Sequence, residues 1–94
     1  MVIISYDISN DKKRRVFSKF LGKFGHRIQY SVFEIDNAQS VLNNIILEIN
    51  NKYKKMFDQS DSVYIFNLSK NCKIFRYGYA ENDEKSILFV WYVL

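Results

Sequence analysis

The chain has 94 residues, of which 48% are hydrophobic and 17% aromatic, and this composition excludes an intrinsically disordered segment. The formal net charge is +4, and the single cysteine excludes an internal disulfide and the common zinc-binding spacings. The length suits one domain over residues 1–94, and no apolar run approaches the roughly 20 residues that a membrane-spanning helix needs. Because no secretory signal pattern opens the chain, we predict a cytoplasmic protein. We also predict that it does not bind membranes, because the apolar side of its first helix would be needed for the core.

Alternating apolar residues predict a first strand over residues 2–8, which ends near Asp7. One face of this strand would carry Val2, Ile4 and Tyr6, and the other would carry Ile3, Ser5 and Asp7. A helix is predicted over residues 10–24, because Ser9 and Asn10 are favoured capping residues. Its apolar residues recur at helical spacing and would form its buried stripe: Val16, Phe17, Phe20, Leu21 and Phe24.

A second strand is predicted over residues 26–35, after Gly25, which would end the helix in a left-handed conformation. Alternation divides this strand into a helix-facing set and an opposite set: Ile28, Tyr30 and Val32 against Arg27, Gln29, Ser31, Phe33 and Ile35. A second helix follows over residues 38–56, where apolar residues again have helical spacing. Three further strands are predicted over residues 62–68, 73–77 and 86–93.

The predicted order is therefore β-α-β-α-β-β-β, and it is closest to an α+β fold of the ferredoxin-like type, β-α-β-β-α-β, with both helices on one face of a four-stranded sheet. This match requires a direct crossover from the second strand through the second helix to the third strand, with the fourth strand as a hairpin partner. Its core would cover about residues 1–78. The segment of about residues 85–94 would form an additional C-terminal strand that pairs with a partner protomer. The sheet face away from the helices would carry Ile3, Phe33 and Ile35, which are too apolar to stay exposed, so we predict a homodimer.

The common nucleophilic triads and glycine-rich phosphate loops are missing from the sequence. Asp7 is the candidate catalytic and metal-binding residue, because it lies at a strand end on the face predicted to meet the partner protomer. Two Asp7 carboxylates about 5 Å apart across a two-fold axis would repel each other by about 3 kcal/mol at an effective dielectric of about 20. Such a pair would share a proton or bind a divalent cation such as Mg²⁺, which could activate water next to a phosphate. The alternative is a structural acid that complements the dipole of the helix that follows.

Seven of the 14 basic residues fall within the sixteen positions 12–27, which contain no acid, and Asp11 directly precedes them. This clustering is typical of a surface that binds a polyanion, and arginine forks match the geometry of phosphate groups. Binding would occur through the nucleic-acid backbone and be largely independent of sequence. A solvated helix face is the alternative. The predicted nucleic-acid-binding residues are Lys12, Lys13, Arg14, Arg15, Lys19 and Arg27.

Three stretches of the sequence carry a family resemblance: Y-D-I-S-N-D at residues 6–11, Arg15-Val16, and R-I-Q-Y-S-V-F-E at residues 27–34. They closely resemble the small CRISPR-associated adaptation nuclease family, the smaller of the two proteins of the spacer-acquisition complex. The resemblance implies a ferredoxin-like homodimer in which the C-terminal strand joins the partner's sheet. It also implies that Asp7 is the metal and catalytic position at the dimer interface.

The resemblance further assigns Tyr6, Arg15, Arg27 and Phe33 to family positions linked to activity or substrate, with Tyr6 and Phe33 in supporting roles. It implies CRISPR adaptation, in antiviral defence, by a dimer that bridges two dimers of the larger integrase and holds a DNA duplex. The family includes metal-dependent endonucleases of RNA or DNA and also non-catalytic scaffolds. Retention of Asp7 does not decide between an Mg²⁺-dependent endonuclease and a DNA-binding scaffold. A dimeric interaction module without nucleic acid is the third alternative.

Overall fold

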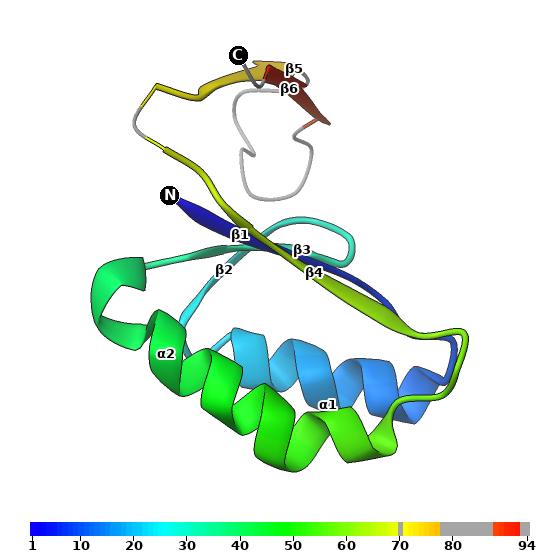
Figure 1. Cartoon of the computed structure of the whole chain (residues 1–94). Helices are drawn as coiled ribbons and strands as arrows, with labels where there is room; N and C mark the ends of the chain where they lie inside the picture. The colour runs from blue at the N-terminus through cyan, green and yellow to red at the C-terminus, as the bar shows by residue number, and fades with distance from the viewer. Residues whose placement is uncertain (70, 78–87, 93–94) are drawn as a thin grey trace.

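The computed structural model describes residues 1–69, 71–77 and 88–92. Its main elements are β1 (Val2–Asp7), α1 (Asp11–Leu21), β2 (Gly25–Gln29), β3 (Val32–Ile35), α2 (Ala38–Glu48), β4 (Ser62–Asn67), β5 (Lys73–Tyr77) and β6 (Leu88–Tyr92). Four strands form an antiparallel sheet in the order β2-β3-β1-β4. Both helices lie on one side of this sheet, and β5 and β6 lie on the other (Figure 1). The predicted α+β, ferredoxin-like arrangement is therefore confirmed.

The second predicted strand is a hairpin of two strands rather than one continuous strand. The chain turns at Tyr30 and Ser31, where Ser31 has a φ of 73°, and β3 then runs back along β2. This hairpin supplies the two consecutive strands in the middle of the ferredoxin-like order. The alternation pattern missed the turn because the glycine, proline and asparagine that usually mark a reversal are missing there.

The hairpin turn, together with a β-bulge in β2, reverses the faces that alternation had predicted. Phe33 and Ile35 lie in the core between the sheet and the helices, whereas Tyr30 is 72% exposed. Ile3 points to the other face but is completely buried within one chain. The prediction that Ile3, Phe33 and Ile35 need a second protomer to cover them was therefore wrong.

Aromatic side chains fill the core between the sheet and the helices. Phe17 of α1 is completely buried at its centre. Its ring centroid lies 5.3 Å from that of Tyr6, 5.6 Å from that of Tyr53 and 5.5 Å from that of Phe57. Edge-to-face contacts of this kind add to the free energy of burying the rings. The predicted stripe of α1 is confirmed at Phe17, Phe20 and Leu21. Val16 is instead 42% exposed, and Phe24 lies beyond the end of the helix and is partly buried.

The helix α1 begins where it was predicted to begin but ends earlier than predicted. The helix begins where predicted, because the Asn10 side chain accepts a hydrogen bond of 3.0 Å from the backbone N–H of Lys13. It ends before Gly22, so Gly25 is not its left-handed cap as predicted. Gly25 instead starts β2, where a Cβ atom would stand 2.0 Å from the carbonyl oxygen of Glu34. The close approach of β2 to β3 therefore requires a residue without a side chain.

The second predicted helix, residues 38–56, begins as α2 and continues through a π turn (η1, Ile49–Tyr53) and a 3-10 turn (η2, Lys54–Met56). The helical segment therefore ends at Met56, as predicted. β5 has its predicted range, and it pairs along its length with β6 of the same chain. Pairing with β5 occupies one edge of β6. The rest of the predicted C-terminal segment, 85–87 and 93–94, and the predicted core boundary at residue 78 lie outside the described residues. No helix in the described ranges is both long and apolar enough to cross a bilayer.

Candidate nucleic-acid interface

A pocket of about 290 Å³ lies between α1 and the β2–β3 hairpin. Its walls are formed by Tyr6, Asp11, Arg14, Arg15, Ser18, Arg27 and Tyr30. Three guanidinium groups and one carboxylate face this space, so it carries a net positive charge. We call it the arginine pocket. An anion with several acceptor oxygens is the ligand that its chemistry fits best.

One face of α1 supplies four of these side chains. Arg14 and Arg15 lie three and four residues after Asp11, and Ser18 lies four and three residues after them, so all four share one side of the helix. The sequence prediction had placed Arg14 and Arg15 in one set with three lysines of the same helix. Nothing in the spacing alone shows which side of α1 meets the β2–β3 hairpin. The tertiary fold selects the stripe that begins at Asp11.

Arg14 is held in place by two contacts within its own segment. It donates a hydrogen bond of 3.0 Å to the carbonyl oxygen of Ile8 and forms a close ion pair with Asp11. The hydrogen bond to the Asp11 carboxylate raises the pKa of Arg14 above its usual value. Its guanidinium also lies 6.0 Å from the centroid of the Tyr30 ring. Arg14 is therefore a fixed positive charge in the pocket wall.

Arg27 and Arg15 complete the positive lining from two different elements. Arg27 comes from β2 and donates a hydrogen bond to the Ser18 hydroxyl on α1. Its guanidinium lies 5.3 Å from the centroid of the Phe33 ring, which gives Phe33 a physical role in orienting it. Arg15 is exposed and makes no ion pair or hydrogen bond with any described residue. The Tyr6 ring stacks on Phe33 at 6.3 Å and reaches the same pocket.

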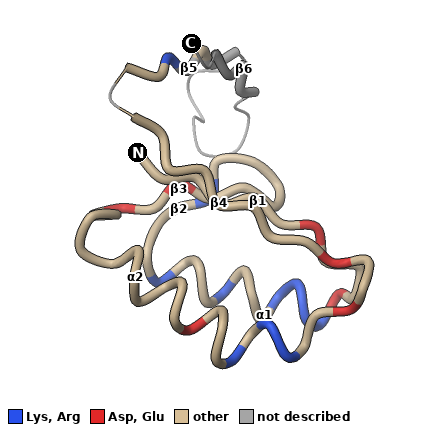
Figure 2. The backbone as a smooth tube through the Cα atoms, in the orientation of Figure 1, with Lys and Arg blue, Asp and Glu red and all other residues tan. Residues whose placement is uncertain are grey.

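The remaining predicted binding residues do not line the pocket. Figure 2 shows basic residues along α1, where Lys12 and Lys19 are exposed and lie outside the lining. Lys13 is directed to a loop on the other side, where its amine lies 3.5 Å from a carboxylate oxygen of Asp58. The structure thus brings together three of the six predicted residues, namely the arginines.

Asp7 stands apart from the arginine pocket. It is the last residue of β1, it is exposed, and it pairs in register with Ser62 of β4. Because Tyr6 faces the helices, the alternation of the strand directs Asp7 to the opposite face of the sheet. Among the described residues, no three His, Cys, Asp or Glu side chains gather in a way that could hold a metal ion. Within the described part of one protomer, Asp7 therefore offers a single carboxylate, whereas Mg²⁺ is usually held by one or two carboxylates together with water and substrate phosphates.

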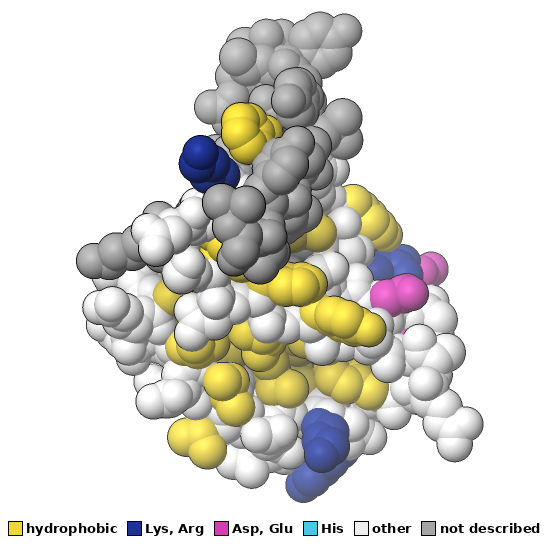
Figure 3. Space-filling view, turned by 45° about the horizontal axis from the view of Figure 1, so that its top comes forward, with side chains coloured by type: hydrophobic (Ala, Val, Ile, Leu, Met, Phe, Trp, Pro, Cys, Tyr) yellow, Lys and Arg dark blue, Asp and Glu magenta, His cyan; other side chains and the backbone are white. Residues whose placement is uncertain are grey.

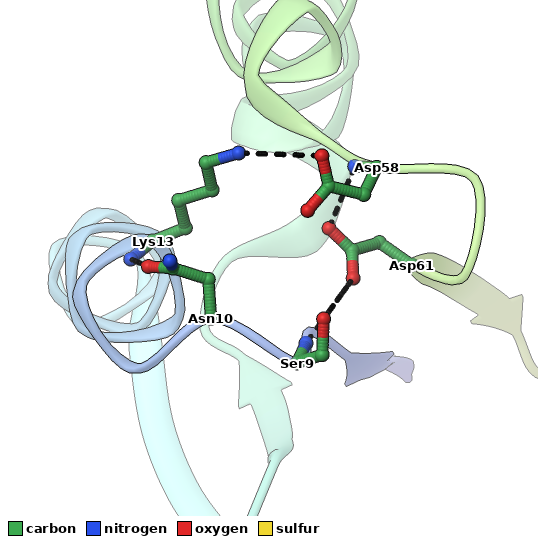
Figure 4. A network of polar contacts seen from close by, with 5 residues as sticks. All are labelled: Ser9, Asn10, Lys13, Asp58 and Asp61. Atoms are coloured by element: carbon green, nitrogen blue, oxygen red, sulfur yellow. Dashed lines mark hydrogen bonds and ion pairs between the residues drawn. The ribbon is translucent and has the colours of Figure 1, made fainter.

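A network of polar contacts fixes the turn that follows Asp7 (Figure 4). The backbone N–H and the hydroxyl of Ser9 donate to one carboxylate oxygen of Asp61, at 3.1 and 3.3 Å. The backbone N–H of Asp58 donates to the other oxygen at 2.8 Å. These N–H donors lower the pKa of Asp61, because they stabilise the ionised carboxylate.

Comparisons with known proteins identify the family to which the chain belongs. A family model described as CRISPR associated protein Cas2 matches residues 1–74. The chain is 33% identical over 70 residues to the CRISPR-associated endoribonuclease Cas2 3 of Synechocystis, covering 73% of this chain and 72% of that protein. It is 32% identical over 71 residues to the CRISPR-associated endoribonuclease Cas2 1 of Chloroflexus aurantiacus, covering 76% and 74%. The crystal structure of Streptococcus pyogenes Cas2 at pH 6.5 is similar with a TM-score of 0.56 and 26% identity, covering 74% of this chain and 87% of that one. The chain therefore belongs to the Cas2 family of CRISPR-associated proteins.

Proposed function

We propose that this protein acts in CRISPR adaptation as a homodimer that binds the phosphate backbone of nucleic acid through the arginine pocket. The observation that carries the proposal is the gathering of Arg14, Arg15 and Arg27 from two elements around one space. Arginine forks hold phosphate oxygens in a bidentate geometry. Because phosphates are the same at every step of a strand, such contacts position nucleic acid without reading its sequence.

Each arginine would contribute differently to binding. Arg15 would contact phosphate directly, since no described residue competes for its donors. Arg27 would do so from a position set by Ser18 and the Phe33 ring. Arg14 would act mainly as a fixed charge, because Asp11 already accepts from it. Exposed lysines on α1 would extend the positive field along the bound strand.

The proposed homodimer would form through the sheet face opposite the helices. Tyr64 and Phe66 of β4 support this, because they pair in register with Ser5 and Ile3 of that face and are 61% and 40% exposed. Figure 3 shows several apolar side chains exposed on the face of the molecule that it presents. Large exposed apolar side chains are typical of protein interfaces. The larger CRISPR integrase, and a partner strand beside the β5–β6 hairpin, belong to the same proposal.

The salt dependence of nucleic-acid binding tests this function. Labelled duplex DNA and duplex RNA are titrated at several salt concentrations, since each neutralised phosphate adds about −0.9 to the slope of log K against log salt. We expect Arg15→Ala and Arg27→Ala each to reduce the magnitude of that slope by about one. Lys55→Ala is the matched control, because Lys55 is exposed on η2 and does not line the pocket. If neither duplex binds in a salt-sensitive manner, the result would instead favour a dimeric interaction module without nucleic acid.

A second candidate function is a metal-dependent endonuclease. The position of Asp7 favours it: this exposed carboxylate lies on the face proposed for the dimer, where a second copy could supply the other one. The relatives named above carry the word endoribonuclease in their names. We expect Asp7→Ala to abolish Mg²⁺-dependent cleavage of RNA or DNA while dimer formation and backbone binding persist. Spacer acquisition that survives Asp7→Ala would identify the scaffold as the main role, whereas cleavage that survives would exclude the Asp7 site.

A further inference from the structure

Tyr30 is an exposed aromatic residue at a position where folding does not require one. It stands at the tip of the β2–β3 hairpin and is 72% exposed, the highest value among the large apolar side chains that the structure describes. Small polar residues and glycine are the usual occupants of such a turn. The turn is held by its backbone, since the N–H of Tyr6 donates to the carbonyl oxygen of Ser31 at 3.1 Å. The ring is therefore available to a ligand.

The surroundings of Tyr30 indicate what kind of ligand this is. The ring is part of the lining of the arginine pocket, and the guanidinium of Arg14 lies 6.0 Å from its centroid. Arg15 and Arg27 line the same space. An exposed ring beside several cations is the combination that holds single-stranded nucleic acid, because the ring stacks on a base while the cations bind the backbone. A volume of about 290 Å³ is near the lower end for ligand pockets, which suits one nucleotide.

We propose that Tyr30 is a stacking platform for one unpaired base, whose phosphate is held by Arg15 and Arg27. This inference rests on the proposed backbone binding and adds a substrate class to it, namely a single-stranded segment or an unpaired end. Bases inside a duplex are already stacked on their neighbours and would have to leave the helix to reach the ring, which costs a few kcal/mol. The arginine pocket without the platform would bind both forms by charge alone.

The test compares three fluorescent probes: a short oligothymidylate, the same oligonucleotide with abasic sites in place of the bases, and a duplex of equal length. For Tyr30→Ala we expect about a 5- to 150-fold loss of affinity for the oligothymidylate, the range that corresponds to truncation of a stacking aromatic. We expect little change for the abasic strand and the duplex. Tyr30→Phe, which keeps the ring without the hydroxyl, should bind all three probes like the wild type. Leu47→Ala is the control for loss of an exposed apolar side chain, because Leu47 is 56% exposed on α2 and lies outside the pocket.

The outcomes separate this inference from the proposed function. If Tyr30→Ala weakens binding of all three probes equally, or of none, the stacking platform is wrong while backbone binding stands. A loss in Tyr30→Phe as large as that in Tyr30→Ala would assign the effect to the hydroxyl and also overturn stacking. If the wild type binds no probe in a salt-dependent manner, the proposed function itself fails. Circular dichroism of each variant verifies that the overall secondary structure is retained.

Discussion

Asp11 is the single acidic side chain in the arginine pocket, and it limits what the pocket can bind. A phosphate about 6 Å from its carboxylate would be repelled by about 0.7 kcal/mol in water. We therefore expect Asp11→Asn to bind oligonucleotides about threefold more tightly at low salt, with the gain fading as salt screens it. Fluorescence anisotropy measures this, and Glu48→Gln on α2 is the control for the same change in net charge. Equal gains in both variants would show that net charge alone is responsible.

The lowered pKa of Asp61 predicts that the stability of the protein depends on pH. Its pKa in the folded protein lies below the ordinary value of 3.8, because the N–H groups of Asp58 and Ser9 donate to its carboxylate. The stability that it contributes is thus fully present above the pKa of the unfolded chain and is lost as the pH falls through the lower folded-state pKa. We expect urea unfolding to show a loss below about pH 4 that is smaller in Asp61→Asn. Asp58→Asn is the control, because it keeps the backbone N–H that donates to Asp61. It should retain the part of the wild-type pH dependence of stability that Asp61 contributes.

The β2–β3 hairpin is the element on which the arginine pocket depends, and Gly25 allows its strands to approach. An alanine there would put a Cβ atom 2.0 Å from the carbonyl oxygen of Glu34 and 2.9 Å from the Cα of Ile35. We expect Gly25→Ala to lower the free energy of unfolding by about 1–3 kcal/mol, as overpacking does. Gly22→Ala is the matched control, because its Cβ would meet nothing closer than 3.5 Å and its φ is −61°. Urea denaturation that ranks the two variants in the opposite order would contradict this account.

For the whole molecule, the arrangement separates two surfaces. The arginine pocket lies on the side of α1, whereas Asp7 and Tyr64 belong to the sheet face away from the helices. If that face is the dimer interface, Tyr64→Asp places a charge in it, and we expect sedimentation velocity to show a monomer. Leu47→Asp changes an equally apolar, 56% exposed side chain on the helical side and should leave the dimer intact. A monomer caused only by Leu47→Asp would move the interface to α2.

The sequence by itself determined the features that depend on local chemistry. The cap at Asn10 follows from a side-chain acceptor within reach of a nearby N–H, and the buried stripe of α1 follows from helical spacing around Phe17. The motifs at residues 6–11 and 27–34 were sufficient to identify the family, because they are read directly from residue identity. The same holds for the concentration of positive charge between Lys12 and Arg27.

Only the tertiary structure decided which of these residues meet. Alternation in residues 26–35 was interpreted as one strand, because the reversal at Tyr30 and Ser31 depends on long-range pairing with β1 and not on a strong local turn signal. That reversal moves Phe33 into the core and brings Arg27 to Ser18 of α1. Strand alternation and helical spacing describe each element alone. The arginine pocket arises where two elements meet, so its members could be found only from their packing.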